Sequence, residues 1–523
     1  MSKPAILSQI PVEKSGEQNV SSVLQTGEKW FLGSLMLLSV ALRLIRITEP
    51  FLDSWSWKQL TNAMVSRNFY LHGYHFFFPQ VDWAGPYPGY IGTEFPLVPF
   101  LASLLYAVFG VHEWIGRSIS IFFFIIAVPA FYLLVRKISN TQSACIASVA
   151  YCVAPLAFMA SRSFQSDIAS LNFAIIAIYF FSEWLDELSS RKLFFLAAAA
   201  STLAILVKLP QLLTGVPLLY LAWEKYGTRL LRKGQLWTFA VLTLIPPLAW
   251  ELHAYHVSVT QYPYHFAGEG GVRIMSGSFY WQLLKVTFTE SLTPILAVGL
   301  IAGLFVWPRA KYGKVFHFWL LGFVVFVILT GRENRHPWVQ LPAVPIAAAF
   351  LGVALDSLGR RLFRSLRQTP ALATTCAILF ATILFVSMSI LSFGSLRAYY
   401  KPWQLPSYHA AVEIQRITTP SDLIVTADNG DPVVIYYSGR RGWHFMEHFG
   451  GRPSNSAEAT EELERLRAQG GRYFVLNAYT IWWLDYYKLR DFRMYLDSRY
   501  RRVSESPEYV IYDISGAGRS ASN

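Results

Sequence analysis

Charged residues are scarce in this sequence. Only 15% of its 523 residues are Asp, Glu, Lys or Arg, whereas a soluble globular chain carries roughly 25%. Hydrophobic residues make up 53% of the chain and aromatic residues 16%. This composition excludes an ordinary soluble enzyme and indicates a protein that crosses a membrane several times.

Cysteine is scarce as well. The three cysteines, Cys145, Cys152 and Cys376, all lie inside apolar runs. No two of them have the spacing of metal ligands, and a thiol in a membrane helix usually only packs against its neighbours. We therefore expect neither a disulfide framework nor a zinc site.

An excess of negative charge is also missing, because the net charge is +12. A chain with this much positive charge could bind nucleic acid, but its Lys and Arg residues are not spread along one face, as a nucleic-acid-binding surface requires. They gather in short segments between apolar runs, as the topology signals of membrane proteins do. We therefore expect membrane lipids, and no nucleic acid, among the partners.

Long apolar runs fill most of the chain. Residues 1–28 are polar and are expected to form a disordered cytoplasmic tail. The first apolar run is Trp30–Ile47, and further runs lie at 117–137, 142–160, 167–184, 193–207, 209–223, 235–253, 289–307, 315–330, 337–356 and 371–393. A bilayer helix needs about 20 residues, so these runs predict a mainly α polytopic membrane domain, residues 29–394, with about 11 transmembrane helices.

The run Phe95–Val111 decides the topology. If it is a surface or re-entrant helix and the N-terminus is inside, the basic clusters all lie in the cytoplasm; if it spans, they all lie outside. The positive-inside rule favours the surface helix. The clusters are Arg136–Lys137, Arg191–Lys192, Lys225–Lys233, Arg309–Lys314 and Arg360–Arg367.

This topology puts the polar residues of interest on one side. The outer segments include residues 48–116, 254–288 and 395–523. The loop Ile47–Phe95 is long, aromatic and rich in carboxylates, whereas a mere connection between membrane helices is usually short and polar. Ionisable groups beside an apolar wall suit a functional site at a membrane surface. We therefore expect an extracytoplasmic active site, with 48–116 as its catalytic loop with surface helices.

The tail, residues 395–523, changes character. Hydrophobic patterns predict helices at Val412–Ile417, Asp431–Tyr437 and Ala457–Ala468 and strands at Asp422–Ala427 and Arg472–Asn477. Strands that alternate with helices indicate a small α/β domain. Its phrase YYSGRRGWHF, Tyr436 to Phe445, is either a surface turn of a structural domain or a contact to sugar or phosphate.

Several stretches in order resemble the GT-C superfamily of multi-pass membrane glycosyltransferases, in particular the protein O-mannosyltransferases and the bacterial lipid A aminoarabinose transferases. The resemblance covers most of residues 30–395. It rests on ALRLIRITEPFLDSW, GTEFPLVPFLASLLYAVFGVHEWIGRS, SRSFQSDIASLNFAIIAIYF, LAILVKLPQLL and RENRHPWVQLPAVPIAAAF. Because bacterial members share the tail phrase, the resemblance implies a multi-pass protein of the bacterial plasma (inner) membrane.

The resemblance also implies an activity: transfer of a sugar, with inversion, from a polyprenyl-phosphate donor to a lipid, glycan or protein acceptor on the outer face. The acceptor hydroxyl needs a base, and Asp53 matches the family's first-loop acid. Asp167 opens a span and Glu94 precedes the surface helix; we expect both at the catalytic site. Each acid has a simpler reading as a helix cap or dipole partner. Ser54 departs from the mannosyltransferases, which commonly have Glu there.

The leaving group is a lipid phosphate, so cations must meet its charge. Lys208, at a break between two spans, is expected to bind the donor phosphate, or else to snorkel to the surface. A second basic group at an outer helix entrance is also expected to bind the donor phosphate: Arg332, Arg335 and His336. Arg117, which begins the second span, is expected to bind phosphate too, or else to anchor the chain at the interface. No metal site is expected from the spacing, although a divalent cation between Asp53 and Asp167 stays open.

Two other functions remain open at this point. A transporter or flippase for lipid-linked sugars would show repeated halves and broken helices at the midplane, and no such repeat is present in the sequence. A non-catalytic assembly factor for lipid-linked glycans would tolerate changes at Asp53, Asp167 and Lys208. Carboxylates beside a basic phosphate site favour the enzyme.

Overall fold

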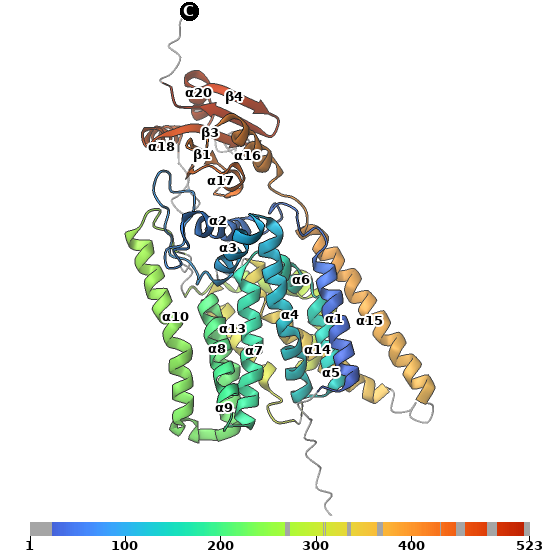
Figure 1. Cartoon of the computed structure of the whole chain (residues 1–523). Coiled ribbons are helices and arrows are strands. Elements are labelled where there is room, and N and C mark those ends of the chain that lie inside the picture. Colours follow the sequence, from blue (N-terminus) through green and yellow to red (C-terminus); the bar gives the residue numbers. More distant parts are fainter. Residues whose placement is uncertain are drawn as a thin grey trace, which may run out of the picture.

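The computed structural model describes residues 24–516 apart from 267–271, 307, 309, 332–335, 363–369, 429, 446–454 and 479–488. It has a helical bundle, two shorter helices across one end of that bundle, and a small α/β domain above them (Figure 1). The bundle and these two helices comprise α1 (Thr26–Arg43), α2 (Ser56–His72), α3 (Leu97–Phe109), α4 (Glu113–Ile138), α5 (Thr141–Val153), α6 (Pro155–Arg162), α7 (Ser166–Asp186), α8 (Arg191–Val207), η1 (Leu209–Thr214), α9 (Gly215–Tyr226), η2 (Gly227–Arg232), α10 (Gly234–Thr260), α11 (Gly277–Val286), η3 (Thr287–Ser291), α12 (Thr293–Leu304), α13 (Val315–Leu329), η5 (Pro337–Gln340), α14 (Ala343–Leu362) and α15 (Pro370–Tyr399).

The mainly helical fold predicted from the apolar runs is confirmed, since each of those runs contains helix. Among the described residues, four helices are long and apolar enough to cross a membrane alone: Glu113–Ile138, Ser166–Asp186, Ala343–Arg361 and Leu379–Tyr399. Two bent pairs reach that length together, α5 with α6 at 59° and α11–η3 with α12 at 115°. Pro155 explains the first bend, because it forces the preceding Ala154 out of helical conformation.

One predicted boundary was wrong. The segment 254–288 is not a loop throughout, because α10 continues to Thr260 and α11 begins at Gly277. No Gly or Pro interrupts the sequence between residues 254 and 260, so nothing stops the helix there. The connection between these two helices is correspondingly shorter than predicted.

Small residues let the central helices approach closely. On α12, a Cβ added to Gly299 would lie 2.5 Å from Leu351, and one added to Gly303 would lie 2.5 Å from Phe350. On the same helix as these partners, a Cβ on Gly352 would lie 2.4 Å from the carbonyl oxygen of Ser143 in α5. Membrane helices associate through such close contacts, because lipid gives little hydrophobic drive for their packing. Helix α14 is thereby fixed between α12 and α5.

Helices α2 and α3 lie across the end of the bundle and do not cross it (Figure 1). Helix α3 has 13 residues, too few to span a bilayer, which agrees with the predicted surface helix. Both helices contribute to one apolar cluster that also includes residues of the α/β domain. The cluster contains Leu60, Ala63 and Met64 of α2, Val98 and Ala102 of α3, and Ile424, Val433, Val434 and Ile435 of the α/β domain.

The α/β domain has the elements predicted for it and some that were missed. It consists of α16 (Leu405–Ile417), β1 (Leu423–Ala427), α17 (Val433–Ser438), β2 (Gly442–His444), α18 (Ser456–Ala468), β3 (Gly471–Asn477), α20 (Arg490–Arg499), β4 (Arg501–Ser506) and β5 (Tyr509–Asp513). The strand order is β2-β1-β3-β5-β4. Strand β1 pairs in parallel with β2 and β3, and β5 pairs antiparallel with β3 and β4.

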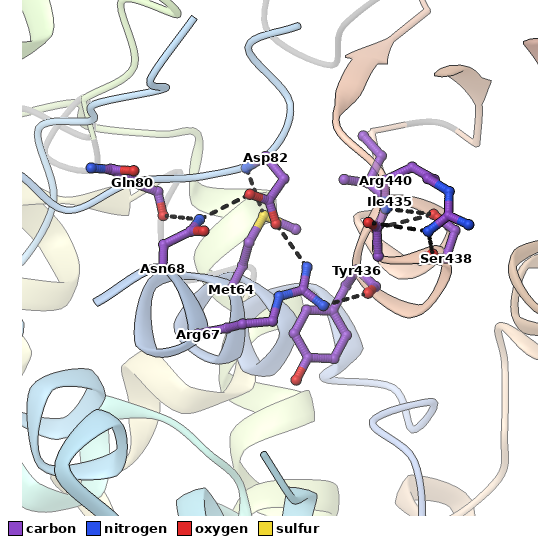
Figure 2. A network of polar contacts seen from close by, with 10 residues as sticks. Met64, Arg67, Asn68, Gln80, Asp82, Ile435, Tyr436, Ser438 and Arg440 are labelled. Atoms are coloured by element: carbon purple, nitrogen blue, oxygen red, sulfur yellow. Dashed lines mark hydrogen bonds and ion pairs between the residues drawn. The ribbon is translucent and has the colours of Figure 1, made fainter. Parts of the chain in front are cut away.

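A polar network docks the α/β domain on α2 (Figure 2). Arg67 of α2 donates to the Asp82 carboxylate at 2.8 Å and to the Tyr436 carbonyl oxygen at 2.8 Å. Its guanidinium also lies over the Tyr436 ring, 4.4 Å from the centroid. Asn68 donates to Asp82 at 2.9 Å. One loop carboxylate therefore orients the arginine that holds helix α17.

Backbone contacts complete this docking. The Gly442 amide donates to the Asp82 carbonyl at 3.0 Å, and the Gly85 amide donates to the Gly442 carbonyl at 2.7 Å. Gly85 has a φ of 58°, and a Cβ there would lie 2.1 Å from the Trp443 ring. Only glycine fits this position, because it tolerates the left-handed backbone and leaves room for the indole.

We expect Asp82→Ala to weaken the docking strongly, because it leaves the Arg67 cation without its carboxylate in a site where the two side chains are only 17% and 9% exposed. Breaking such a buried pair costs about 3–5 kcal/mol. Thermal unfolding and protease cleavage between α15 and α16 would measure the change. The matched control is Glu413→Ala, whose partner Arg416 has a 70% exposed side chain; this change should cost under about 1 kcal/mol. Equal losses in both variants would contradict the role given to Asp82.

Candidate active site

Asp53 precedes the first turn of α2 and is almost completely buried, with 8% of its surface exposed. Its Oδ1 accepts hydrogen bonds from the Trp55 amide and from the Gln59 side chain, both at 2.9 Å. Burial raises the pKa of Asp53 above its ordinary value, while these two hydrogen bonds and the nearby Arg117 oppose the rise. A carboxylate with a raised pKa that is fixed in orientation is suited to take a proton.

A cluster of ion pairs lies at the same end of the bundle. Lys208, between α8 and η1, donates to Asp167 at 2.8 Å and to Glu94 at 2.8 Å. Glu94 Oε1 also accepts from Lys58 of α2 at 3.0 Å. Three predicted site residues, Glu94, Asp167 and Lys208, are thus in direct contact, although they come from the first loop, α7 and the α8–η1 connection.

Lys58 was missed by the sequence analysis. In the sequence it resembles a solvated residue of a short surface helix, whereas its side chain is only 12% exposed. A lysine in an aromatic segment on the side opposite the basic clusters was the available signal, since positive residues are rare on that side. Burial would raise the pKa of Glu94, but Lys208 and Lys58 lower it to about 2. Glu94 is therefore ionised at neutral pH.

Several buried polar atoms beside this cluster have no hydrogen-bond partner within the described part of the chain. They are Glu94 Oε2, Asp167 Oδ2 and both polar atoms of the Gln165 side chain. Burying a polar group without a partner costs about 1–3 kcal/mol. Protein sites that bind polar ligands carry this cost in the empty state, because the ligand supplies the missing partners.

Short contacts tie α2 to the connection between α6 and α7. Gln59 accepts from the Phe164 amide at 3.1 Å, and Asn62 donates to the Phe164 carbonyl at 2.9 Å. Ser170 of α7 donates to the Ala204 carbonyl of α8 at 2.7 Å. These bonds fix the start of α7, and with it Asp167, relative to Asp53 and to Lys208.

Arg117 has other partners than the predicted phosphate. It is 1% exposed, and it donates to the carbonyl oxygens of Ile47, Glu49 and Pro50 while its guanidinium lies over the Phe51 ring. These contacts hold the backbone that leads into the first loop. Arg162 has a similar role, because it donates to the carbonyls of residues 45 and 46.

The second predicted basic group is only partly described. Arg332 and Arg335 lie outside the described residues. His336 stacks on Trp338 with ring centroids 4.6 Å apart, and Trp338 packs against Trp55 at 5.4 Å. The start of η5 therefore lies beside Trp55, two residues after Asp53.

Arg440 in the tail phrase contacts the α/β domain itself. Its guanidinium donates to the side chain and carbonyl of Thr418 and to the carbonyls of Gln415 and Ser438. These bonds cap the end of α16, as the reading of this phrase as a structural turn predicts.

A divalent cation between Asp53 and Asp167 would need the carboxylate oxygens of both residues. One of them, Asp167 Oδ1, accepts from Lys208 at 2.8 Å. Among the described residues, no three His, Cys, Asp or Glu side chains are grouped in a way that could hold a metal ion. Lys208 therefore occupies one oxygen of Asp167, one of the two carboxylates named for such a cation.

The arrangement of the bundle, the first loop and the α/β domain is similar to that of solved membrane proteins, and this similarity shows the fold. Residues 93–250 match the family model described as dolichyl-phosphate-mannose-protein mannosyltransferase. The structure superimposes on ArnT from Cupriavidus metallidurans bound to undecaprenyl phosphate with a TM-score of 0.63 and 15% identity, covering 92% of this chain and 98% of that one. It superimposes on the oligosaccharyltransferase AglB from Archaeoglobus fulgidus, in complex with an inhibitory peptide and a dolichol-phosphate, with a TM-score of 0.59 and 12% identity, covering 95% and 75%.

A curated relative gives no further assignment. An uncharacterized protein of Aquifex aeolicus (strain VF5) is 24% identical over 326 residues, which cover 60% of this chain and 63% of that protein. The chain thus matches somewhat less than two thirds of that protein's length. The structural neighbours confirm the fold that the sequence motifs predicted. The family-model match confirms the resemblance to protein mannosyltransferases over residues 93–250.

Substituting two buried glutamines, Gln59 and Gln165, tests whether the side-chain amide of Gln165 lacks a hydrogen-bond partner. Both Gln59 and Gln165 are fully buried, but within the described part of the chain only the Gln59 side chain has hydrogen-bond partners. We expect Gln59→Leu to lower the stability by about 1–3 kcal/mol, because it removes one of the two hydrogen bonds to Asp53 Oδ1 and leaves the Phe164 amide without its acceptor. Gln165→Leu should leave stability unchanged or raise it. Thermal unfolding in the same detergent measures both; an equal loss would show that Gln165 has a partner.

Proposed function

We propose that the protein is an inverting glycosyltransferase that moves a sugar from a polyprenyl-phosphate donor to a lipid, glycan or protein acceptor on the outer face of a membrane. The observation that carries the proposal is that a buried acid, Asp53, and a lysine–carboxylate cluster lie at the same end of the bundle. The cluster consists of Lys58, Glu94, Asp167 and Lys208. The α/β domain and the first loop then lie outside the cell membrane, as the positive-inside rule favours.

In this proposal Asp53 is the base. Its carboxylate takes the proton of the acceptor hydroxyl while the hydroxyl oxygen forms a bond to the anomeric carbon. The bond between that carbon and the phosphate oxygen breaks on the opposite face of the sugar, so the configuration inverts. The raised pKa of Asp53 supports this role, because a stronger base accepts the proton more readily.

The two lysines receive the leaving phosphate. Each ammonium has three N–H donors. Lys208 uses two of them for Asp167 and Glu94, and Lys58 uses one for Glu94, so donors remain for phosphate oxygens. A cation fixed by carboxylates before the reaction stabilises developing negative charge without reorganising.

The remaining polar atoms suit the sugar. Glu94 Oε2 and Asp167 Oδ2 are acceptors without partners in the described part of the chain, and sugar hydroxyls are donors. Glu94 and Asp167 therefore orient donor or acceptor in this proposal. His336, with Arg332 and Arg335 near it in the sequence, is a second candidate for phosphate binding, and Arg117 supports the loop that carries Asp53.

The test uses purified protein in lipid with a panel of labelled polyprenyl-phosphate sugars and measures release of polyprenyl phosphate. We expect Asp53→Asn to lower kcat by about 100- to 10,000-fold with donor binding retained, because only the base is lost. Lys208→Ala should weaken donor binding as well. Matched controls are the exposed Asp491→Asn in the α/β domain and Lys192→Ala at the other end of α8, which should keep wild-type rates.

The outcomes separate the candidate functions. Equal release by wild type and Asp53→Asn would keep the transferase and remove Asp53 as its base. No release with any donor and acceptor extract, from protein that still unfolds cooperatively, would favour a transporter or an assembly factor for lipid-linked glycans.

A further inference from the structure

The first turn of α2 is held residue by residue. Lys58 pairs with Glu94, and Gln59 bonds both Asp53 and the α6–α7 connection. Between Asp53 and Lys58 lie Ser56 and Trp57, whose side chains bond to the α/β domain. The base and the phosphate ligand of the proposed reaction thus flank the two residues that the α/β domain holds.

The contact from the α/β domain is made by the turn after β1. Asp431 Oδ2 accepts from the Ser56 hydroxyl at 3.1 Å, and the Gly430 carbonyl accepts from the Trp57 indole N–H at 3.0 Å. The other oxygen of Asp431 accepts from the Val433 amide at 3.1 Å, at the start of α17. One carboxyl group therefore joins the first turns of two helices, α2 and α17.

We propose that Asp431 is a positioning residue for the catalytic loop, and that its protonation sets how firmly the α/β domain holds the first turn of α2. The proposal deepens the proposed function, on which it rests, because it gives the α/β domain a part in regulating that site. Asp431 itself touches neither Asp53 nor Lys58 and acts through Ser56.

The surroundings of Asp431 make its charge unfavourable. It is 8% exposed, and the titratable groups that face it are Asp428 at the end of β1 and His444 of β2. His444 Nδ1 lies 3.1 Å from Asp428 Oδ1, so the imidazole is engaged with the other carboxylate. On α2 the contacting side chains are Ser56 and Trp57, neither of which titrates. Burial, reinforced by the charge of Asp428, raises the pKa of Asp431 to about 7.

The sign of the pH effect follows from linkage. With the turn released into water, Asp431 would have its ordinary pKa of 3.8, whereas the docked value is about 7. Docking is therefore strongest where the carboxyl is protonated in both states. It weakens as pH rises from 3.8 toward about 7, and it is insensitive to Asp431 above that value. Between these values docking weakens by up to about tenfold per pH unit.

Amide hydrogen exchange of the full-length protein in lipid measures the docking without any need for activity. After correction for intrinsic exchange, we expect the protection of residues 53–62 and 430–438 to fall up to about tenfold per unit between about pH 5 and 7 and to level off above about pH 8. In Asp431→Asn, which cannot ionise, the fall in protection at residues 430–438 should be absent. At residues 53–62 it should shrink to the part contributed by Asp53, whose pKa burial also raises. Asp513→Asn, in β5, where the carboxylate accepts from Ser515 and lies 3.8 Å from the guanidinium of Arg501, should behave as wild type.

A second variant tests the same contact from α2. The Ser56 hydrogen bond lowers the pKa of Asp431, so Ser56→Ala should keep the pH dependence and move its end to higher pH. Protection that is independent of pH in the wild type would overturn the proposal, and so would the same pH dependence in Asp431→Asn as in the wild type.

The pH dependence of polyprenyl phosphate release links this contact to activity. We expect wild-type release, measured relative to Asp431→Asn, to decline between about pH 5 and 7 and to level off above about pH 8, and we expect the same relative decline in Asp513→Asn. If the exchange results agree and no sugar is transferred, the proposed function fails while the docking device stands. If release follows one pH profile in all three proteins, the positioning role fails while the transferase stands.

Discussion

The carboxylate of Glu94 is the point on which this end of the molecule depends. One of its oxygens binds two lysines, Lys58 and Lys208, that come from separate elements. Because Lys208 also pairs with Asp167, the first loop, α2, α7 and the end of α8 are joined in one cluster of charges. A buried charge is stable only if it is paired, so these elements keep their positions relative to one another.

Helix α2 transmits this order to the α/β domain. Its first turn carries Lys58 toward the bundle and Ser56 toward Asp431, and its fourth turn carries Arg67 to Asp82 and Tyr436. An apolar cluster between these polar contacts contains side chains of α2, α3 and α17. Helix α2 is therefore covered on most of its sides, and most of its residues are buried. Because it has only a small face toward solvent, its sequence does not show the apolar and polar faces of an ordinary amphipathic helix.

Much of this arrangement could be predicted from the sequence. An ionisable side chain at the end of an apolar run is costly to bury without a partner. This cost identified Glu94, Asp167 and Lys208 as candidates, and the structure brings them into contact. It was harder to predict from the sequence which group each side chain would bind. Arg117 has the right residue type for phosphate, but its guanidinium bonds loop carbonyls, which only the tertiary fold decides. Strand β2 has three residues and β4 reads RRVSES, so neither carries the apolar alternation that identifies a strand.

Trp443 packs on Gly85, where even a single methyl group would clash with the indole. These two residues are separated by more than 350 positions in the chain, and the apolar cluster under them also includes Val434 and Ile435. During synthesis, which proceeds from the N-terminus at about 5–20 residues per second, the first loop must therefore wait for tens of seconds with its aromatic surface uncovered. The loop that would carry the chemistry is among the first segments made and among the last to complete its packing.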